Sequence, residues 1–151
     1  MKKFCLIACA CLLAGAPRVL DAQTAADSAA VTRAGLDYIE GFYEGDVAKL
    51  QRSVRTNVVK FGFWRPANKT TFEPDTMSYG QFMSYAERVK ARGGEKAPNA
   101  AIKKVEILDI MNQIASVKVT AWWGVDYLQL GKYDDRWMIA HVIWQSPPVK
   151  P

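Results

Sequence analysis

The sequence predicts an α+β domain in which helices come first and a sheet follows. Apolar residues recur with a helical period before residue 92, and after residue 100 their period changes to two. The later apolar runs are separated by very short connections, which are typical of an antiparallel meander. Because every element has an apolar face to bury, we expect three N-terminal helices packed on a curved antiparallel sheet.

Two helices are expected before residue 55. The apolar positions of the first, over residues 27–44, are Val31, Ala34, Tyr38, Ile39, Phe42 and Tyr43. Their spacing of three or four residues gives the helix one apolar face. Gly45 suits its C-terminal cap, and Asp46 suits the N-cap of a short second helix that carries Val47, Leu50 and Val54.

A short strand over residues 58–64, a proline-containing loop over 65–75 and a third helix follow. Ser78 and Gln81 have the spacing of a capping box, and Met77 with Phe82 has the spacing of a hydrophobic staple. Gly93-Gly94 ends this helix.

Four strands are expected in the second half of the chain, over residues 102–110, 114–123, 125–133 and 136–145. Strict alternation in the last one places Trp137, Ile139, His141 and Ile143 on one face, and Met138, Ala140, Val142 and Trp144 on the other. Both faces are apolar, so we expect the helices to cover one and a second copy of the chain to cover the other. The alternative is that the aromatic residues simply fill the core of a monomer.

Residues 1–22 are expected to be a secretory signal peptide, and residues 23–151 the folded domain. Lys2 and Lys3 are followed by the apolar run 4–16, which is too short to span a bilayer, and cleavage is expected after Ala22. The residues around Cys9 also resemble the lipidation motif of bacterial lipoproteins, but the apolar stretch before Cys9 is too short for it. We therefore expect an exported, periplasmic or secreted protein that is not lipidated.

Removing these 22 residues leaves 129 and removes all three cysteines. The basic residues fall from 20 to 17 and the acidic residues from 15 to 14, so the net charge falls from +5 to +3. The basic cluster comprises Arg88, Lys90, Arg92, Lys96, Lys103 and Lys104. Half of it lies near the end of a helix, where cations are favoured, so a solvated face is expected and nucleic-acid binding is not.

Motifs for cofactor or metal chemistry are missing from the sequence. It has no glycine-rich phosphate loop, no Cys/His cluster, one histidine in total, and no thiol in the mature chain. We therefore expect no cofactor and no metal site.

Two residues are candidates for proton transfer. Asp126 begins a strand among aromatic residues, where loss of water raises the pKa of a carboxyl group; alternatively it caps a turn. His141 lies on an apolar face, which is more typical of a core histidine than of a catalytic one.

The element order resembles the nuclear transport factor 2-like superfamily. Three segments are similar to its lumazine-binding branch: residues 37–46, residues 114–119 with Asp126-Tyr127-Leu128, and residues 137–144. The resemblance implies a cone-shaped cavity between bent sheet and helices, and dimers formed through the other side of the sheet. The superfamily contains isomerases, dehydratases and cyclases as well as binding and assembly modules. The His-Pro pair expected after the second helix is replaced by Val54-Arg55-Thr56, so a cavity histidine is missing there.

Two functions fit these observations. The first is a secreted module that binds a small hydrophobic or aromatic molecule without catalysis, in a cavity lined by Tyr38, Tyr43, Trp64, Phe82, Trp123, Tyr127 and His141. The second is a small cofactor-free isomerase, dehydratase or cyclase. In that case Asp126 or His141 would move a proton, and Tyr38 or Tyr127 would donate to the oxyanion. The low number of titratable groups favours the first.

Overall fold

The structure is a computed structural model that describes residues 19–97 and 102–147. It has three helices, α1 (Val19–Glu44), α2 (Val47–Ser53) and α3 (Tyr79–Ala91). As predicted, Asp46 caps α2 by accepting the Lys49 amide, and Ser78 and Gln81 form a capping box at α3. Gly45 connects α1 to α2 at φ +69°, a conformation that glycine adopts without strain.

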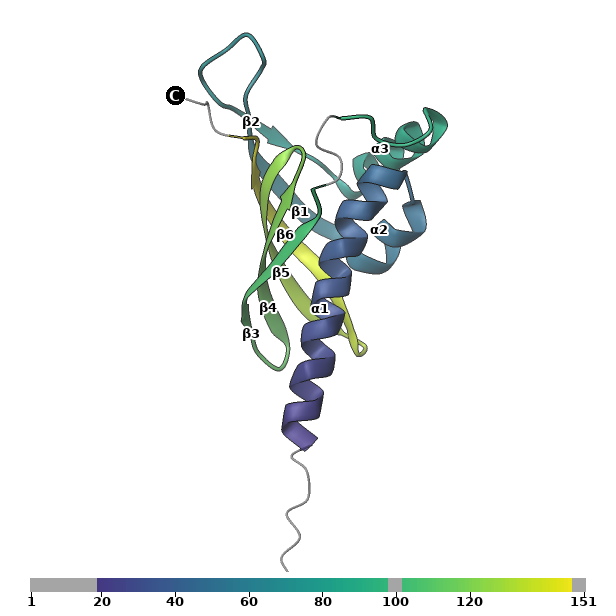
Figure 1. Ribbon diagram of the computed structural model, residues 1–151, viewed down its shortest axis with the longest axis vertical. Helices are drawn as coiled ribbons and strands as arrows, with labels where there is room; N and C mark the ends of the chain where they lie inside the picture. The colour runs from purple at the N-terminus through teal and green to yellow at the C-terminus, as the bar shows by residue number, and fades with distance from the viewer. Residues whose placement is uncertain (1–18, 98–101, 148–151) are drawn as a thin grey trace, which may run out of the picture.

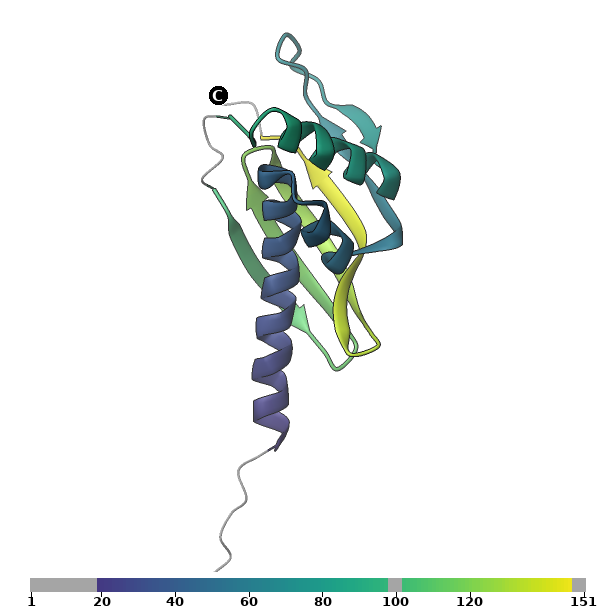
Figure 2. The ribbon, with the colours of Figure 1, turned by 90° about the vertical axis from the view of Figure 1, so that its right-hand side faces the viewer.

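Six strands form one curved sheet, and the three helices cover one face of it (Figures 1 and 2). They are β1 (Val54–Trp64), β2 (Glu73–Thr76), β3 (Lys104–Ile110), β4 (Ile114–Ala121), β5 (Gly124–Tyr133) and β6 (Arg136–Gln145), in the order β2-β1-β6-β5-β4-β3. The predicted meander β3 to β6 is confirmed. The strand β1 differs from the antiparallel arrangement expected for the sheet, because it runs parallel to β6.

The strand β2 was not predicted. It pairs with the end of β1, from Phe61 opposite Thr76 to Trp64 opposite Glu73, and three of its four residues fall in the segment 65–75 that was expected to be a loop. Pro74 argues against a strand in the sequence, because proline cannot donate a backbone hydrogen bond and within sheets is found mainly in edge strands. An edge position is where β2 lies.

A β-bulge at Ala140 overturns the predicted faces of the last strand. Gln129 pairs with His141 but Leu130 pairs with Ile139, so Ala140 is an extra residue in β6. Side chains after the bulge therefore exchange faces. Trp137 lies on the same side as Trp144, and His141 lies on the opposite, outer face of the sheet.

The strand β1 turns a charged residue inward and its large apolar residues outward. Val58, Lys60 and Gly62 are buried, whereas Val59, Phe61 and Phe63 are 54%, 37% and 43% exposed. This is the reverse of what side-chain hydropathy alone favours. The core between helices and sheet thus receives a lysine, and the outer face of the sheet receives an apolar row.

The segment expected to be a signal peptide lies mostly outside the described residues. The expected cleavage point after Ala22 falls within the first turns of α1, whose backbone is described from Val19. Among the described helices, none combines the length and hydropathy needed to cross a bilayer.

Candidate functional site

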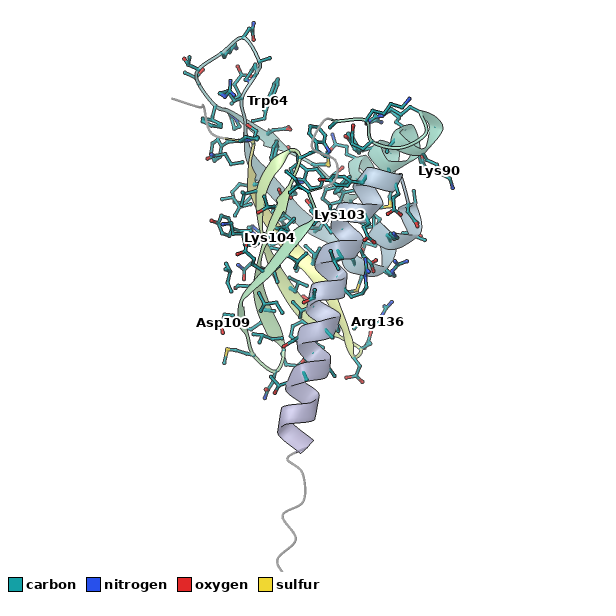
Figure 3. The ribbon with its side chains drawn as sticks, viewed as in Figure 1. Trp64, Lys90, Lys103, Lys104, Asp109 and Arg136 are labelled. Atoms are coloured by element: carbon teal, nitrogen blue, oxygen red, sulfur yellow. The ribbon has the colours of Figure 1, made fainter. Side chains whose placement is uncertain are left out.

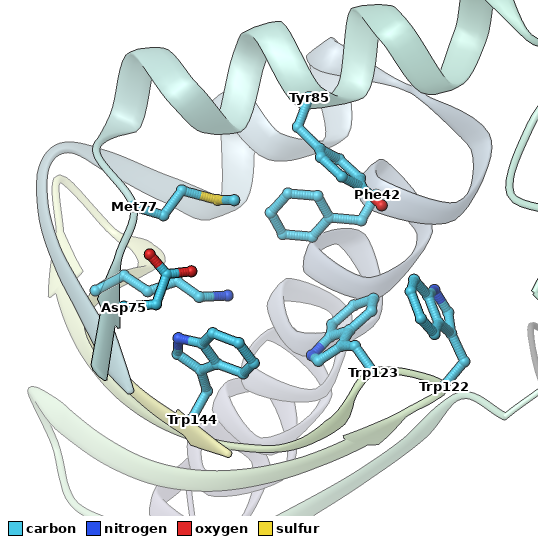
Figure 4. A pocket seen from close by; sticks show the side chains of 8 residues that line it. Phe42, Asp75, Met77, Tyr85, Trp122, Trp123 and Trp144 are labelled. Atoms are coloured by element: carbon cyan, nitrogen blue, oxygen red, sulfur yellow. The ribbon is translucent and has the colours of Figure 1, made fainter. Parts of the chain in front are cut away.

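A pocket of about 170 Å³ lies at one end of the space between helices and sheet. Its lining residues come from six places in the chain: Phe42 on α1, Lys60 on β1, Asp75 and Met77 around β2, Tyr85 on α3, Trp122 and Trp123 between β4 and β5, and Trp144 on β6 (Figure 4). Five of these eight side chains are aromatic. The pocket therefore exists only once the tertiary fold has formed.

A chain of short hydrogen bonds connects the pocket to a buried acid. The Lys60 ammonium donates to the Tyr38 hydroxyl over 2.6 Å, and this hydroxyl donates to Asp126 Oδ2 over 2.6 Å. Lys60 Nζ itself lies 3.5 Å from the same carboxylate oxygen. The Asp126 side chain is 0% exposed, and that of Lys60 is 7% exposed. Tyr38 therefore bridges the two charges, which also contact each other directly.

The second oxygen of Asp126 is also occupied. The Trp123 indole N–H donates to Oδ1 over 2.7 Å, so both carboxylate oxygens accept a hydrogen bond. Such bonds compensate the loss of water around a buried carboxylate. Asp126 is not among the residues that line the pocket, but it accepts hydrogen bonds from two of them, Lys60 and Trp123.

Aromatic rings surround the ammonium of Lys60. Its nitrogen lies 5.3–5.5 Å from the ring centres of Tyr38, Phe42, Phe82 and Trp144, within the range of cation–π attraction. Burial nevertheless lowers the pKa of Lys60, although Asp126 and Asp75 oppose this shift. Burial, together with the charge and hydrogen bond of Asp126, raises the pKa of Tyr38 well above its usual value, so its hydroxyl remains a donor.

Two further contacts shape the walls. Gly62 lies against Trp144, and a Cβ there would come within 2.3 Å of the indole ring and 2.2 Å of the Trp144 carbonyl oxygen. The Tyr43 hydroxyl accepts from the Trp122 amide over 2.8 Å and donates to the Ile102 carbonyl over 2.7 Å. Gly62 thus gives the indole of Trp144 room, and Tyr43 fixes the backbone at Trp122.

Four of the predicted lining residues lie in or directly behind this site. Trp123 lines the pocket, and Tyr38 lies beneath it. Phe82 is fully buried and packs edge-on against Tyr38, with ring centres 6.2 Å apart. Tyr43 packs edge-on against Trp123 at 5.6 Å. These residues build the walls, but of the four only Trp123 faces the pocket.

The other three predicted lining residues lie elsewhere. Tyr127 is exposed on the outer face of the sheet, and His141 lies on that face with its ring 5.2 Å from Phe61. Trp64 is exposed at the end of β1, away from the helices (Figure 3). The bulge at Ala140 explains why His141 lies on the outer face. Alternation along β5 explains why Tyr127 does so, since its neighbour Asp126 points inward.

The two candidates for proton transfer are thus separated by the sheet. Asp126 lies inside and His141 outside. Tyr38, the predicted oxyanion donor, already donates to Asp126. Within the described residues, this geometry provides a pocket beside a buried lysine and no empty point on which an acid and a hydroxyl converge.

Of the eight residues that line the pocket, sequence reasoning assigned only Trp123 to the cavity. Lys60 is the buried charged residue among those that it missed. A lysine in a strand is ordinarily assigned to the solvent side. The available signal was the composition of its neighbours, because Val58, Val59, Phe61 and Phe63 leave no polar face for Lys60 to share. Trp144 and Met77 were placed on elements but were not connected with a site.

The basic cluster is dispersed, and half of its residues are paired with acids. Figure 3 shows Lys90 on the outer side of α3, away from Lys103 and Lys104 near the sheet. Arg92 contacts Glu95, Lys103 contacts Glu40 and Lys104 contacts Glu106. In residues 19–97 and 102–147 there is also no group of three His, Cys, Asp or Glu side chains that could hold a metal ion.

Comparison with known structures shows the same fold in other proteins. An NTF-2-like protein of unknown function from Silicibacter pomeroyi is 18% identical, with a TM-score of 0.63, over 82% of this chain and 98% of that one. An NTF2-like protein of unknown function from Shewanella baltica is 17% identical, with a TM-score of 0.59, over 83% and 97%. The association domain of C. elegans CaMKII is 13% identical, with a TM-score of 0.52, over 84% and 99%.

These similarities confirm the predicted cone-shaped nuclear transport factor 2-like fold. No curated protein matches the sequence. A family described as "Putative lumazine-binding" matches residues 26–145, which include every helix and strand except the first turns of α1. The chain therefore belongs to this lumazine-binding family of the nuclear transport factor 2-like superfamily.

Proposed function

We propose that this protein is an exported module that binds a small aromatic or hydrophobic molecule in the pocket between α3 and the sheet. The observation that carries the proposal is the pocket itself, with five aromatic side chains around one buried lysine. Aromatic walls bind flat molecules by stacking and edge contacts, while a few polar groups fix their orientation. The family assignment also supports small-molecule binding.

The volume of the pocket limits the size of its ligand. Cavities of about 150 Å³ accommodate a molecule of the size of benzene. A pocket of about 170 Å³ therefore suits one aromatic ring, and a larger molecule would extend beyond its open side. This size favours small aromatic compounds.

Binding can be tested by ligand-observed NMR with single-ring aromatic compounds, and with pterin, flavin and steroid compounds for comparison. Replacing Met77 by Trp should fill the pocket and abolish binding of the small compounds. The matched control is Leu108→Trp, because Leu108 is 56% exposed on β3, far from the pocket. If the wild type binds none of these compounds, or if Met77→Trp leaves binding unchanged, the proposal is wrong.

A second copy of the chain is the proposed partner for the outer face of the sheet. Phe61 of β1, Ile143 of β6 and Tyr127 of β5 form one cross-strand row there, and all three are exposed. A row of large apolar side chains on an exposed sheet face is typical of an interaction surface. It suits a two-fold interface, in which both copies use the same patch.

Sedimentation equilibrium tests the dimer. We expect the wild type to be dimeric, Phe61→Glu to be monomeric, and Leu108→Glu, on an exposed residue of β3, to remain dimeric. A monomeric wild type at high micromolar concentration would contradict the proposal.

Export is proposed from the N-terminal sequence. If the full chain is expressed in a Gram-negative bacterium, we expect it in the periplasm with Gln23 as its first residue. Mass spectrometry of the purified protein measures this directly. An intact Met1 terminus, or a lipid on Cys9, would contradict it.

A further inference from the structure

The indole N–H of Trp144 is a buried donor whose acceptor is missing within the described part of the chain. The indoles of Trp123 and Trp137, in contrast, donate to Asp126 and Asp27. Trp144 lines the pocket, and Figure 4 shows its ring nitrogen turned toward the side where Asp75 lies. Because a buried N–H without a partner is unfavourable, an acceptor atom on a bound molecule would stabilise this arrangement.

Lys60 supplies a second donor on the same side of the pocket. Its nitrogen lies 5.4 Å from the ring centre of Trp144. An ammonium group has three N–H donors, and among the described residues Lys60 makes hydrogen bonds to Tyr38 and Asp126. The third donor is available to a ligand atom in the pocket, which Lys60 lines. One oxygen atom could accept from both side chains.

The surrounding charges favour an uncharged oxygen over a carboxylate. Asp126 already balances the positive charge of Lys60, and Asp75 adds a further negative charge at the exposed rim. Lys60, Asp75 and Asp126 thus sum to a net charge of −1. A ligand carboxylate would be repelled by both acids and would lose its water on entering an aromatic pocket. A carbonyl oxygen avoids both costs.

We propose that the pocket recognises a single-ring aromatic compound through an uncharged carbonyl oxygen, which accepts hydrogen bonds from Trp144 Nε1 and Lys60 Nζ. This proposal rests on the binding function proposed above and narrows its ligand class. The ring lies among the aromatic walls, and the carbonyl points toward the two donors. Asp75 at the rim acts against anionic analogues of the same shape.

The test uses three probes of similar size: benzamide with an uncharged carbonyl, benzoate with a charged group, and toluene with neither. Each is titrated into 15N-labelled protein, and the five tryptophan indole N–H signals are followed by NMR. The Trp144→Phe variant assigns the signal of Trp144. We expect benzamide to move this signal downfield and to bind about tenfold more tightly than toluene, as one good hydrogen bond allows.

Variants separate recognition of the carbonyl from simple filling of the pocket. Trp144→Phe and Lys60→Met should each bring benzamide close to the affinity of toluene while toluene binding persists. Trp64→Phe, on an exposed residue outside the pocket, is the control and should bind like the wild type.

The outcomes distinguish the two proposals. Equal binding of toluene and benzamide by the wild type overturns carbonyl recognition but leaves the binding function intact. Tighter binding of benzoate than of benzamide overturns the preference for an uncharged oxygen. Absence of binding for all three probes overturns carbonyl recognition, and the binding function is overturned as well if the pterin, flavin and steroid compounds also fail to bind.

Discussion

Two buried clusters on the inner face of the sheet contain the same residue types but differ in what surrounds them. In the first, Asp126 accepts from the Trp123 indole and lies 3.5 Å from Lys60. In the second, Asp27 of α1 accepts from the Trp137 indole over 2.9 Å and pairs with Lys132 over 2.8 Å. Each cluster joins an acid, a tryptophan and a lysine, yet only the first borders the pocket.

The difference lies in the distance between the charges. Asp27 and Lys132 contact each other directly, so the lysine is engaged in holding α1 to β5. In the other cluster the Tyr38 hydroxyl binds both Lys60 and Asp126, and the direct contact between the two charges is longer, at 3.5 Å. Lys60 is stabilised there but remains part of the pocket wall. The comparison shows that residue types alone do not identify a site, since an intervening hydroxyl and an adjacent pocket make the distinction.

The largest expected effect is on stability at the two acids. Asp126→Asn removes the carboxylate that contacts the buried ammonium of Lys60 and leaves only the more distant Asp75, at the rim, among the acids described near it. We expect this to lower the free energy of unfolding by about 3 kcal/mol. Asp27→Asn should cost about 1 kcal/mol, because both members of its ion pair are 12% exposed and retain some water. Urea denaturation of both variants measures the two values. Equal losses would mean that the clusters are energetically alike.

The next effect concerns the Tyr38 hydroxyl, which bridges Lys60 and Asp126. Tyr38→Phe deletes one acceptor for Lys60 and one donor to Asp126, so we expect a loss of about 1–2 kcal/mol. Tyr127→Phe on the exposed outer face is the matched control and should change stability by less than about 0.5 kcal/mol. If the two variants are equally stable, the Tyr38 hydroxyl does not stabilise the cluster around Asp126.

A smaller effect is expected in the pH dependence of stability. Burial lowers the pKa of Lys60 in the folded protein, whereas the pKa of a lysine in the unfolded chain is about 10.4. Between these two pKa values the unfolded chain binds more protons, so stability due to this group rises with pH. The free energy of unfolding of the wild type, minus that of Lys60→Met, should therefore increase from pH 7 toward pH 10. A constant difference would show that Lys60 keeps its ordinary pKa.

The smallest effect is expected at Glu40 of α1, an acid that faces the surface, unlike Asp126 and Asp27. Burial alone would raise the pKa of Glu40, but hydrogen bonds from Lys49 and Arg33 outweigh it and lower the pKa to about 2. Its stabilising contribution should be present above about pH 4.3, the usual value for glutamate, and disappear as the pH falls through 2. Glu40→Gln should cost about 0.5 kcal/mol at pH 7 and nothing near pH 2.

The acid-dependent loss can be followed by thermal unfolding at both pH values. Glu87→Gln, on the exposed side of α3, serves as the control. A loss for Glu40→Gln that is the same at pH 7 and pH 2 would contradict the depressed pKa.

Local patterns were sufficient for most of the elements. The caps at Asp46 and Ser78, the helices that follow them and the four-strand meander were predictable because each depends on residues near one another in the sequence. The short strand β2 was not predictable, since its hydrogen bonds come from β1 and its own residues include proline.

The candidate site was predictable only in part. Asp126, Tyr38 and Trp123 were recognised as an acid and aromatic residues of interest, and the fold brings them together. His141 and Tyr127 were assigned to the same cavity by alternation, but one extra residue at Ala140 and the inward turn of Asp126 place both outside. Alternation has no means of detecting a bulge, because the extra residue is defined by its partner strand.

The sequence by itself therefore determined the order of the elements, the α+β class and the aromatic composition of the core, since periodicity and caps are local properties of the chain. The tertiary structure alone decided which face each strand presents to the helices. That choice depends on the parallel pairing of β1 with β6 and on the bulge in β6, both of which join residues far apart in the chain. It turned Lys60 inward beside Trp144 and left Phe61 outside, and so it created both the pocket and the apolar outer row.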